Sequence, residues 1–124
     1  MYSNSQKLII QGSLNDLNQF ISALRSHWSR GAKMKRENTD IVRVECLAQK
    51  LKKVDAPCFI EYHFYCKNMK KDKDNIAAFG IKAINDGLQE AHILLQDSWK
   101  AIDGYQTYFY VDKLNPRVEV IINW

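Results

Sequence analysis

Cys58-Phe59-Ile60-Glu61-Tyr62-His63-Phe64-Tyr65-Cys66 is a run of mostly aromatic and apolar residues. Aromatic residues favour strands, and the turn residues Val54-Asp55-Ala56-Pro57 precede this run. The run therefore predicts a β-strand, and its apolar character predicts a central one.

Segments on either side of this strand predict the rest of the fold. The expected elements are a strand over 7–11, a helix from about residue 14 capped by Ser13 or Asn15, helices over 37–53 and from 75 to about 90, and strands over 105–112 and 117–123. Leu114-Asn115-Pro116 is a turn signal that predicts a β-hairpin between the last two strands. Residues 91–96 are expected to form a short strand or an extended link. The prediction is one α/β (α+β) domain over 1–124, with the order β-α-α-β-α-β-β and a mixed sheet of about four strands covered by helices.

Helical spacing assigns an apolar face to two of these helices. In the second helix the face comprises Ile41, Val44, Leu47, Ala48 and Leu51, opposite a basic outer face. In the third it comprises Ile76, Phe79, Ala83, Ile84 and Leu88, with Asp72 or Asp74 as the N-cap.

Composition narrows the class of protein. The 124 residues are 46% hydrophobic and carry a net charge of +4, as in ordinary globular proteins with some affinity for polyanions. No apolar run is long enough for a membrane helix, and residues 1–6 do not resemble a secretory signal. The three cysteines lack a C-x-x-C pair, which predicts free thiols in a reducing cytoplasm.

Clustered carboxylates in this basic chain suggest a metal site. Asp72 and Asp74 follow the aromatic strand at D-x-D spacing, and Asp97 follows the third helix. Residues two apart in an extended segment point to the same side, so the first two can converge on one cation. Carboxylate oxygens suit Mg²⁺, with Mn²⁺ as a substitute. The alternative is a solvated loop that caps a helix.

Lys82 lies two helical turns beyond Asp74, where its ammonium could reach a phosphate near the metal. The alternative is an ion pair with Asp86, four residues further on.

The motifs together resemble the RusA family of Holliday-junction resolvases, in its phage and prophage forms from Gram-positive bacteria. The resemblance runs from about residue 12 to residue 120. It is carried by Asp72-Lys73-Asp74-Asn75, Asp86-Gly87-Leu88, Asp97-Ser98-Trp99-Lys100 and Val111-Asp112-Lys113-Leu114-Asn115-Pro116-Arg117. Gln96 stands where many members have another acidic residue.

The resemblance implies a homodimeric, Mg²⁺-dependent endodeoxyribonuclease that nicks two strands of a four-way DNA junction symmetrically, in recombination and repair. Asp72, Asp74 and Asp97 match the three essential aspartates, and Lys82 matches the essential lysine by its spacing from Asp86. Lys82 lies one helical turn further from Asp74 than the essential lysine does in the bacterial form of the family. No membrane or small-molecule cofactor is implied, and a phage-encoded enzyme would act in the cytoplasm of its bacterial host.

A DNA surface is expected at two basic segments and at one residue of the first loop. The residues are Asn15, Arg30, Lys33, Lys35, Arg36, Lys70, Lys71 and Lys73. Trp28 is expected to pack under a loop rather than stack on a base, and Trp99 to support the segment that carries Asp97. The aromatic strands are expected to form core and subunit interface.

Three alternatives remain at this point: a nuclease for forks or flaps, a branched-DNA-binding protein without catalysis, and a phage protein whose charge is incidental.

Overall fold

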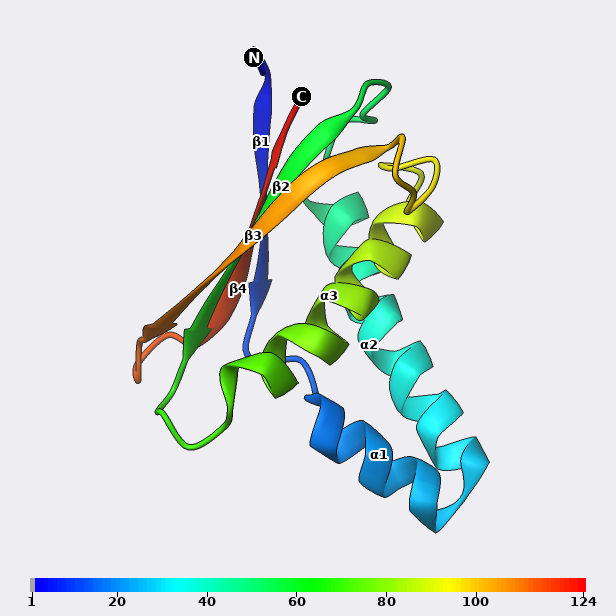
Figure 1. Ribbon diagram of the computed structural model, residues 1–124, viewed down its shortest axis with the longest axis vertical. Coiled ribbons are helices and arrows are strands. Elements are labelled where there is room, and N and C mark those ends of the chain that lie inside the picture. The colour runs from blue at the N-terminus through cyan, green and yellow to red at the C-terminus, as the bar shows by residue number, and fades with distance from the viewer. Residues whose placement is uncertain (1) are drawn as a thin grey trace.

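The computed structural model describes residues 2–124 and has the predicted order of elements. These are β1 (Ser5–Gln11), α1 (Leu17–Ser26), α2 (Trp28–Ala48), β2 (Cys58–Cys66), α3 (Lys73–Glu90), β3 (Ile102–Val111) and β4 (Arg117–Asn123). The predicted mixed four-stranded sheet with helices is confirmed (Figure 1).

The strands are ordered β1-β4-β2-β3, so the aromatic strand β2 is central as predicted. It pairs in parallel with β3 and antiparallel with β4, with Tyr62 between Thr107 and Val120. The predicted hairpin is wrong, because β2 lies between β3 and β4. The turn signal at residues 114–116 is real, but a turn does not fix which strands pair. Here β4 joins β1 to β2, and its Val118, Val120 and Ile122 are buried.

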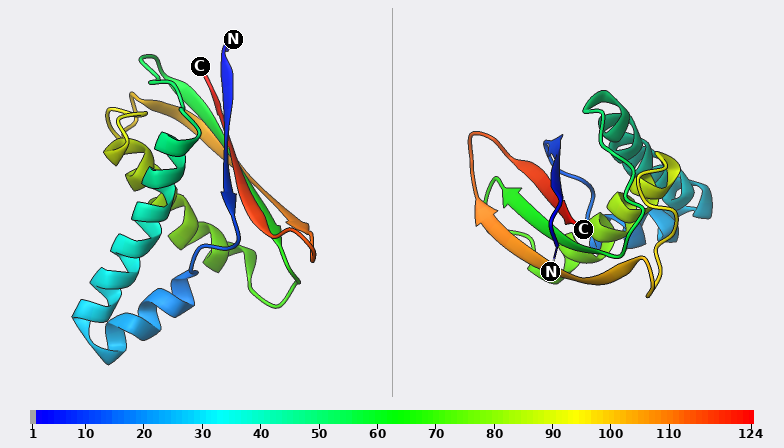
Figure 2. Two further views of the ribbon diagram at one scale, coloured as in Figure 1. Left: turned by 180° about the vertical axis from the view of Figure 1, so that it is seen from behind. Right: turned by 90° about the horizontal axis from the view of Figure 1, so that it is seen from above.

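The fold has two layers, with the helices on one face of the sheet (Figure 2). Alternate residues of β2 point to the helices, and Cys58, Ile60, Tyr62 and Phe64 are buried there. The other face of the sheet carries no helix, and residues Phe59, Glu61, His63 and Tyr65 of β2 are only partly buried.

Helix α1 begins with a capping box at Asp16, whereas the sequence predicted Ser13 or Asn15 as the N-cap. Asp16 is the N-cap and accepts a hydrogen bond from the Gln19 N–H, while the Gln19 side chain accepts one from the Asp16 N–H. Ser13 and Asn15 are not caps.

Helix α2 begins nine residues earlier than predicted and buries a different face. His27 caps it, accepting from the Ser29 N–H. The buried residues include Asn38, Val42 and Cys46, whereas Ile41, Val44 and Leu47 are exposed. The face is decided by the contact with α3, where Val42 packs against the bare backbone of Gly87.

Trp28, expected to pack under a loop, and Trp99, expected to support the segment that carries Asp97, are both on the surface. Trp28 is 71% exposed at the start of α2, and Trp99 is 97% exposed. Residues 91–96 form turns rather than a strand. The three cysteines are free thiols, as predicted, with Cys46 and Cys58 buried. Within residues 2–124, no helix is both long and apolar enough to cross a membrane.

Candidate functional site

Asp72 and Asp74 lie together at the N-terminus of α3, directly after the loop that leaves β2. Asp72 is the N-cap residue, but its carboxylate makes no capping hydrogen bond. Asp74 stands in the first turn, and its Oδ1 accepts from the Asn75 N–H at 3.0 Å. The partial positive charge of the helix N-terminus stabilises both carboxylates, which are exposed. They are therefore accessible to a ligand.

The neighbouring lysines are engaged elsewhere. Lys71 Nζ lies 3.1 Å from Asp16 Oδ2, and the Asp16 side chain is almost fully buried. Lys73 Nζ lies 5.8 Å from the centre of the Phe109 ring. Among the ion pairs of residues 2–124, none involves Asp72 or Asp74. The pair thus keeps its negative charge in a basic surrounding.

Asp97 lies in the segment that follows α3 and contacts another part of that helix. Its Oδ2 accepts from Asn85 Nδ2 at 3.4 Å, and Asn85 Oδ1 accepts from the buried Tyr62 hydroxyl at 2.6 Å. Asn85 comes about three helical turns, or roughly 16 Å, beyond Asp74. The structure therefore brings Asp72 and Asp74 together and leaves Asp97 apart from them.

The donor set can be compared with what Mg²⁺ requires. This ion is commonly bound through one or two carboxylates, with water and substrate phosphate completing the shell. Asp72 and Asp74 fit that pattern by chemistry and exposure. In residues 2–124, however, no three His, Cys, Asp or Glu side chains are grouped so that they could hold a metal. The predicted site of three aspartates is not assembled here.

Lys82 forms the ion pair with Asp86 that was the predicted alternative to phosphate binding. Its Nζ lies 3.1 Å from Asp86 Oδ1. Lys82 also borders a shallow groove between the helices, together with Lys35 and Phe20. Its side chain is 57% exposed and still open to an anion from solvent.

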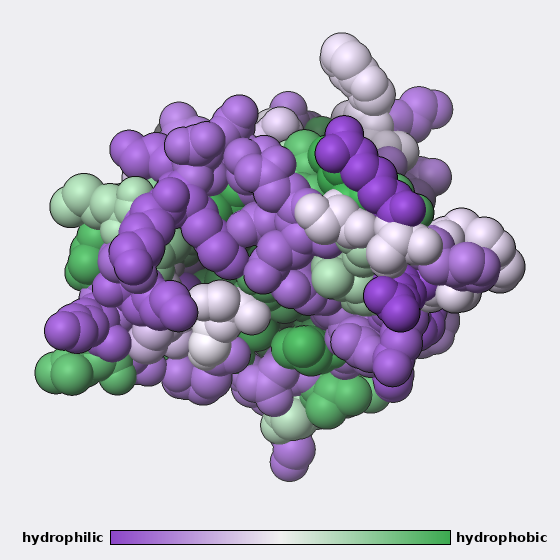
Figure 3. Space-filling view, turned by 90° about the horizontal axis from the view of Figure 1, so that it is seen from below, coloured by the Kyte–Doolittle hydropathy of each residue, from purple (hydrophilic) through white to green (hydrophobic). Residues whose placement is uncertain are grey.

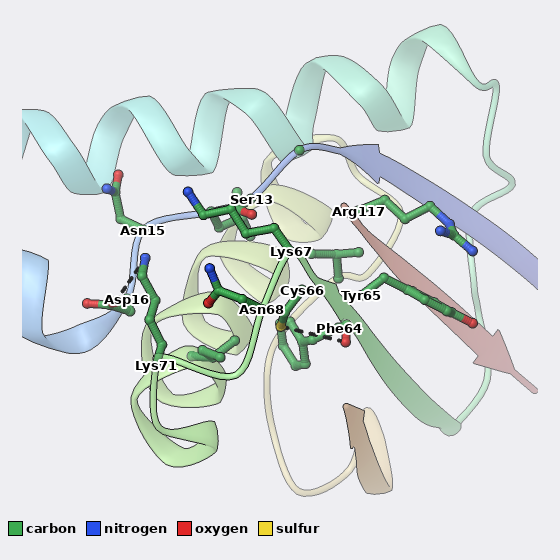
Figure 4. Close-up of a pocket in the computed structure, with 14 residues that line it drawn as sticks. Ser13, Asn15, Asp16, Phe64, Tyr65, Cys66, Lys67, Asn68, Lys71 and Arg117 are labelled. Atoms are coloured by element: carbon green, nitrogen blue, oxygen red, sulfur yellow. Dashed lines mark hydrogen bonds and ion pairs between the residues drawn. The ribbon is translucent and has the colours of Figure 1, made fainter. Parts of the chain in front are cut away.

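A cleft lies beside the start of α3 (Figure 4). Lys71 and Ile76, which flank the aspartate pair in the sequence, line it, whereas Asp72 and Asp74 do not. Its walls come from the β1–α1 loop, the end of β2 and the start of α3, and they include apolar Leu14, Phe64, Ile76 and Val118. Lys67, Asn68 and Lys71 bring polar groups to it, and Figure 4 shows Lys71 reaching Asp16. Sequence reasoning missed Lys67 and Asn68. The signal available was their position directly after β2, since loops that follow strands often carry binding groups.

The predicted basic segment of α2 divides into free and engaged cations. Arg36 binds Asp40 at 2.7 Å and Glu90 at 2.5 Å, and these hydrogen bonds raise its pKa. It links α2 to α3 and is less available to DNA. Arg30, Lys33 and Lys35 are exposed, and Lys33 has only a loose 3.8 Å pair with Glu37.

Asn15 fastens the β1–α1 loop to α2. Its Oδ1 accepts from Asn38 Nδ2 at 2.7 Å, and its N–H donates to Asn38 Oδ1 at 2.9 Å. Its Nδ2 donates to Gln19 at 3.1 Å. These contacts give Asn15 a structural role, and its contact with DNA stays a prediction.

The basic segments gather at one end of the molecule. The α1–α2 corner, the β2–α3 loop with Lys70 and Lys71, and the β3–β4 turn all lie at the lower end in Figure 1. Viewed from that end, the surface is mostly hydrophilic with separate apolar patches (Figure 3).

Comparison with protein-family models found no match, and no curated protein matches the chain. The resemblance to the RusA family therefore stays a prediction that rests on the motifs of the sequence.

Proposed function

We propose that this chain is a homodimeric, Mg²⁺-dependent endodeoxyribonuclease that resolves Holliday junctions or related branched DNA. The observation that carries the proposal is the unpaired carboxylates Asp72 and Asp74 at a helix N-terminus, beside a cleft with lysines. The resemblance of the motifs to RusA resolvases supplies the substrate.

Each group has a defined task in this proposal. Asp72 and Asp74 hold the ion, which when bound would polarise the scissile phosphate and lower the pKa of water. Lys67 and Lys70 bind the DNA backbone beside the pair, and Lys82 binds a phosphate further along α3. Two cuts on a two-fold symmetric junction need two sites, which a symmetric dimer provides.

Asp97 has a conditional place in the proposal. A role at the metal requires the segment over 91–101 to move along α3 when DNA binds. Without that movement, Asp97 orients Asn85 and is a positioning residue for α3.

Cleavage of a labelled four-way junction in Mg²⁺ tests the proposal, with wild type compared with Asp74→Asn. The amide retains the oxygen that accepts from the Asn75 N–H, so the fold is preserved while the charge is removed. Paired symmetric nicks are expected from the wild type, and only binding from the variant. Asp55→Asn, an exposed aspartate outside the site, is the matched control and retains cleavage.

A second candidate is a branched-DNA-binding protein without catalysis, favoured by the separation of Asp97 from the aspartate pair. It predicts junction binding without cleavage in Mg²⁺ or Mn²⁺. A nuclease for forks or flaps instead predicts faster cleavage of those substrates than of the junction, so all three are assayed together with linear duplex.

A further inference from the structure

The two edges of the sheet differ in how they are protected. At the β1 edge, Gln49 of α2 caps the backbone of Ile9, accepting from its N–H at 2.9 Å and donating to its carbonyl at 2.6 Å. The side chain of Gln6 likewise exchanges two hydrogen bonds with the backbone of Lys52. This edge is closed by side chains.

The β3 edge has no such cover among the described residues. Strand β3 is ten residues long, contains neither proline nor a basic residue, and has Asp103 as its one charge. Natural proteins usually protect exposed edges with prolines, lysines or bulges, because an open edge pairs with another strand. The register of β3 against β2 shifts once, between Ile102 and Gly104, and the edge from Gly104 onward is unprotected. This part of the edge is therefore a pairing surface.

The backbone of β3 can be oriented from its last bond to β2. The Asp112 N–H donates to the Cys66 carbonyl. Alternate residues of a strand direct their backbone groups to the same neighbour, so the even-numbered residues from Gly104 to Tyr110 face β2. The N–H and C=O groups of Tyr105, Thr107 and Phe109 therefore face the free edge. These groups need a strand partner when they are removed from water.

We infer that a second copy of this chain pairs with β3 in antiparallel register, with Thr107 opposite Thr107 of the partner subunit across a two-fold axis. This pairing uses the regular part of the strand, residues 104–110, and places each Tyr105 opposite a Phe109. The inference rests on the proposed function, which requires a dimer, and it specifies where the two subunits meet.

Side chains at the two ends of β3 complement each other in this register. Tyr105 and Trp99 are exposed toward the beginning of the strand, and Val111, Met69 and Leu114 at its end. Antiparallel pairing brings the first group of one subunit to the second group of the other and buries exposed apolar surface.

Charge does not oppose the pairing. The one carboxylate of the strand, Asp103, lies at the shift of register and accepts a hydrogen bond from the Tyr2 hydroxyl of its own chain at 2.6 Å. Since the strand has no basic residue, DNA is a poor occupant of this edge. The two-fold axis is perpendicular to the sheet, so both helical layers face the same side.

Light scattering of the purified chain, without DNA, tests the interface. The wild type is expected at about twice 14.5 kDa. Thr107→Pro removes an outward N–H, which an edge strand tolerates, and is expected at the mass of one chain. Thr107→Val keeps the N–H and is the matched control that stays dimeric. A monomeric wild type, or a folded Thr107→Pro dimer, overturns the inference.

Amide hydrogen exchange of the wild type gives a reading that does not depend on a variant folding. The N–H groups of Tyr105, Thr107 and Phe109 are expected to exchange slowly in the dimer and faster on dilution. Fast exchange in a dimeric protein assigns the interface to another surface and overturns the inference. If the chain forms a β3-paired dimer that does not cleave DNA, the proposed nuclease function is wrong and the inferred interface stands. If the chain is a monomer that cleaves DNA, the nuclease function stands and the inferred interface is wrong.

Discussion

Tyr62 connects the sheet to α3 through one buried hydrogen bond. Its side chain is fully buried, burial raises its pKa, and the neutral hydroxyl donates to Asn85 Oδ1. Tyr62→Phe leaves the Asn85 oxygen without that donor in a buried position. We expect the free energy of unfolding to fall by about 1–3 kcal/mol, measured by denaturant unfolding followed by circular dichroism.

Tyr108→Phe is the matched control for this change. The Tyr108 hydroxyl bonds to Gln106 on the face of the sheet without helices, where water can replace the lost partner. Its unfolding free energy is expected to stay within about 0.5 kcal/mol of wild type. Equal losses in the two variants would contradict the importance of the Tyr62–Asn85 bond.

The buried thiols predict how stability depends on pH. Burial raises the pKa of Cys46 to about 12 and that of Cys58 to about 11, above the ordinary value of 9.0. From about pH 9 the unfolded chain loses these protons while the folded chain keeps them, so stability is complete below pH 9 and falls as pH rises to about 11–12.

Unfolding free energies measured between pH 7 and pH 11 check this expectation. The fall above pH 9 is expected to be smaller in the double variant Cys46→Ala, Cys58→Ala, although that variant is less stable at pH 7 because of the cavities left. An identical pH dependence in both proteins would show that other groups cause the fall.

At the scale of elements, the contact between α2 and α3 depends on Gly87. A Cβ at this position would lie 2.5 Å from the Cβ of Val42, which is too close without a shift of the helices. Gly87→Ala is expected to reduce the unfolding free energy by about 1–3 kcal/mol through overpacking. Thermal unfolding of Gly87→Ala, Val42→Ala and the double variant measures the coupling.

The double variant is the informative member of that set. A Cβ at residue 87 would also lie 2.5 Å from Cγ1 of Val42, which Val42→Ala removes while the Cβ contact stays. If the clash is the cause, Val42→Ala costs less in the Gly87→Ala protein than in wild type. Additive losses would assign the effect of Gly87→Ala to another contact. A glycine in the Asp86-Gly87-Leu88 motif thereby has a packing reason independent of catalysis.

The elements differ in how far the sequence predicted them. The order of strands and helices was predictable because each element has its own local signal, such as the aromatic run of β2. The pairing of β4 was not, because it depends on contacts between distant strands. The buried face of α2 was not either, because Asn38 and Gly87 carry no hydrophobic signal and yet form the contact.

The candidate site follows the same division. Asp72 and Asp74 were predictable neighbours because a single residue separates them and one helix start holds both. The position of Asp97 depends on the path of the chain after α3, which spacing alone does not define. Asp97 instead contacts Asn85, a residue without a motif that would have indicated this role in the sequence.

At the scale of the whole molecule, the β3 edge is separate from the α2 part of the basic end, although the end of β3 adjoins the β2–α3 loop that carries Lys70 and Lys71. The edge carries aromatic side chains and one carboxylate, whereas the basic end carries Arg30, Lys33 and Lys35 beside the α1–α2 corner. A dimer formed through β3 leaves Arg30, Lys33 and Lys35 of each subunit free. Pairing and DNA binding can thus be perturbed independently.

Salt dependence of junction binding locates the DNA surface. Lys33→Gln with Lys35→Gln is expected to weaken binding and to reduce the slope of log K against log salt by about 2, because each released phosphate contact contributes about one unit. Fluorescence anisotropy over a salt series measures that slope. Arg36→Gln is expected to change the slope less, since Asp40 and Glu90 already hold its guanidinium.

Lys50→Gln with Lys52→Gln is the matched control, because it removes the same charge near the end of α2, away from the basic end. If DNA binds at the basic end, this pair leaves the slope nearly unchanged, since charges beyond a Debye length of about 8–10 Å are screened. Equal slopes for both double variants would mean that net charge alone attracts DNA, and would remove the α2 segment from the interface. A reduced slope for the α2 pair alone, with dimer mass unchanged, would assign phosphate binding to Lys33 and Lys35 independently of the subunit contact.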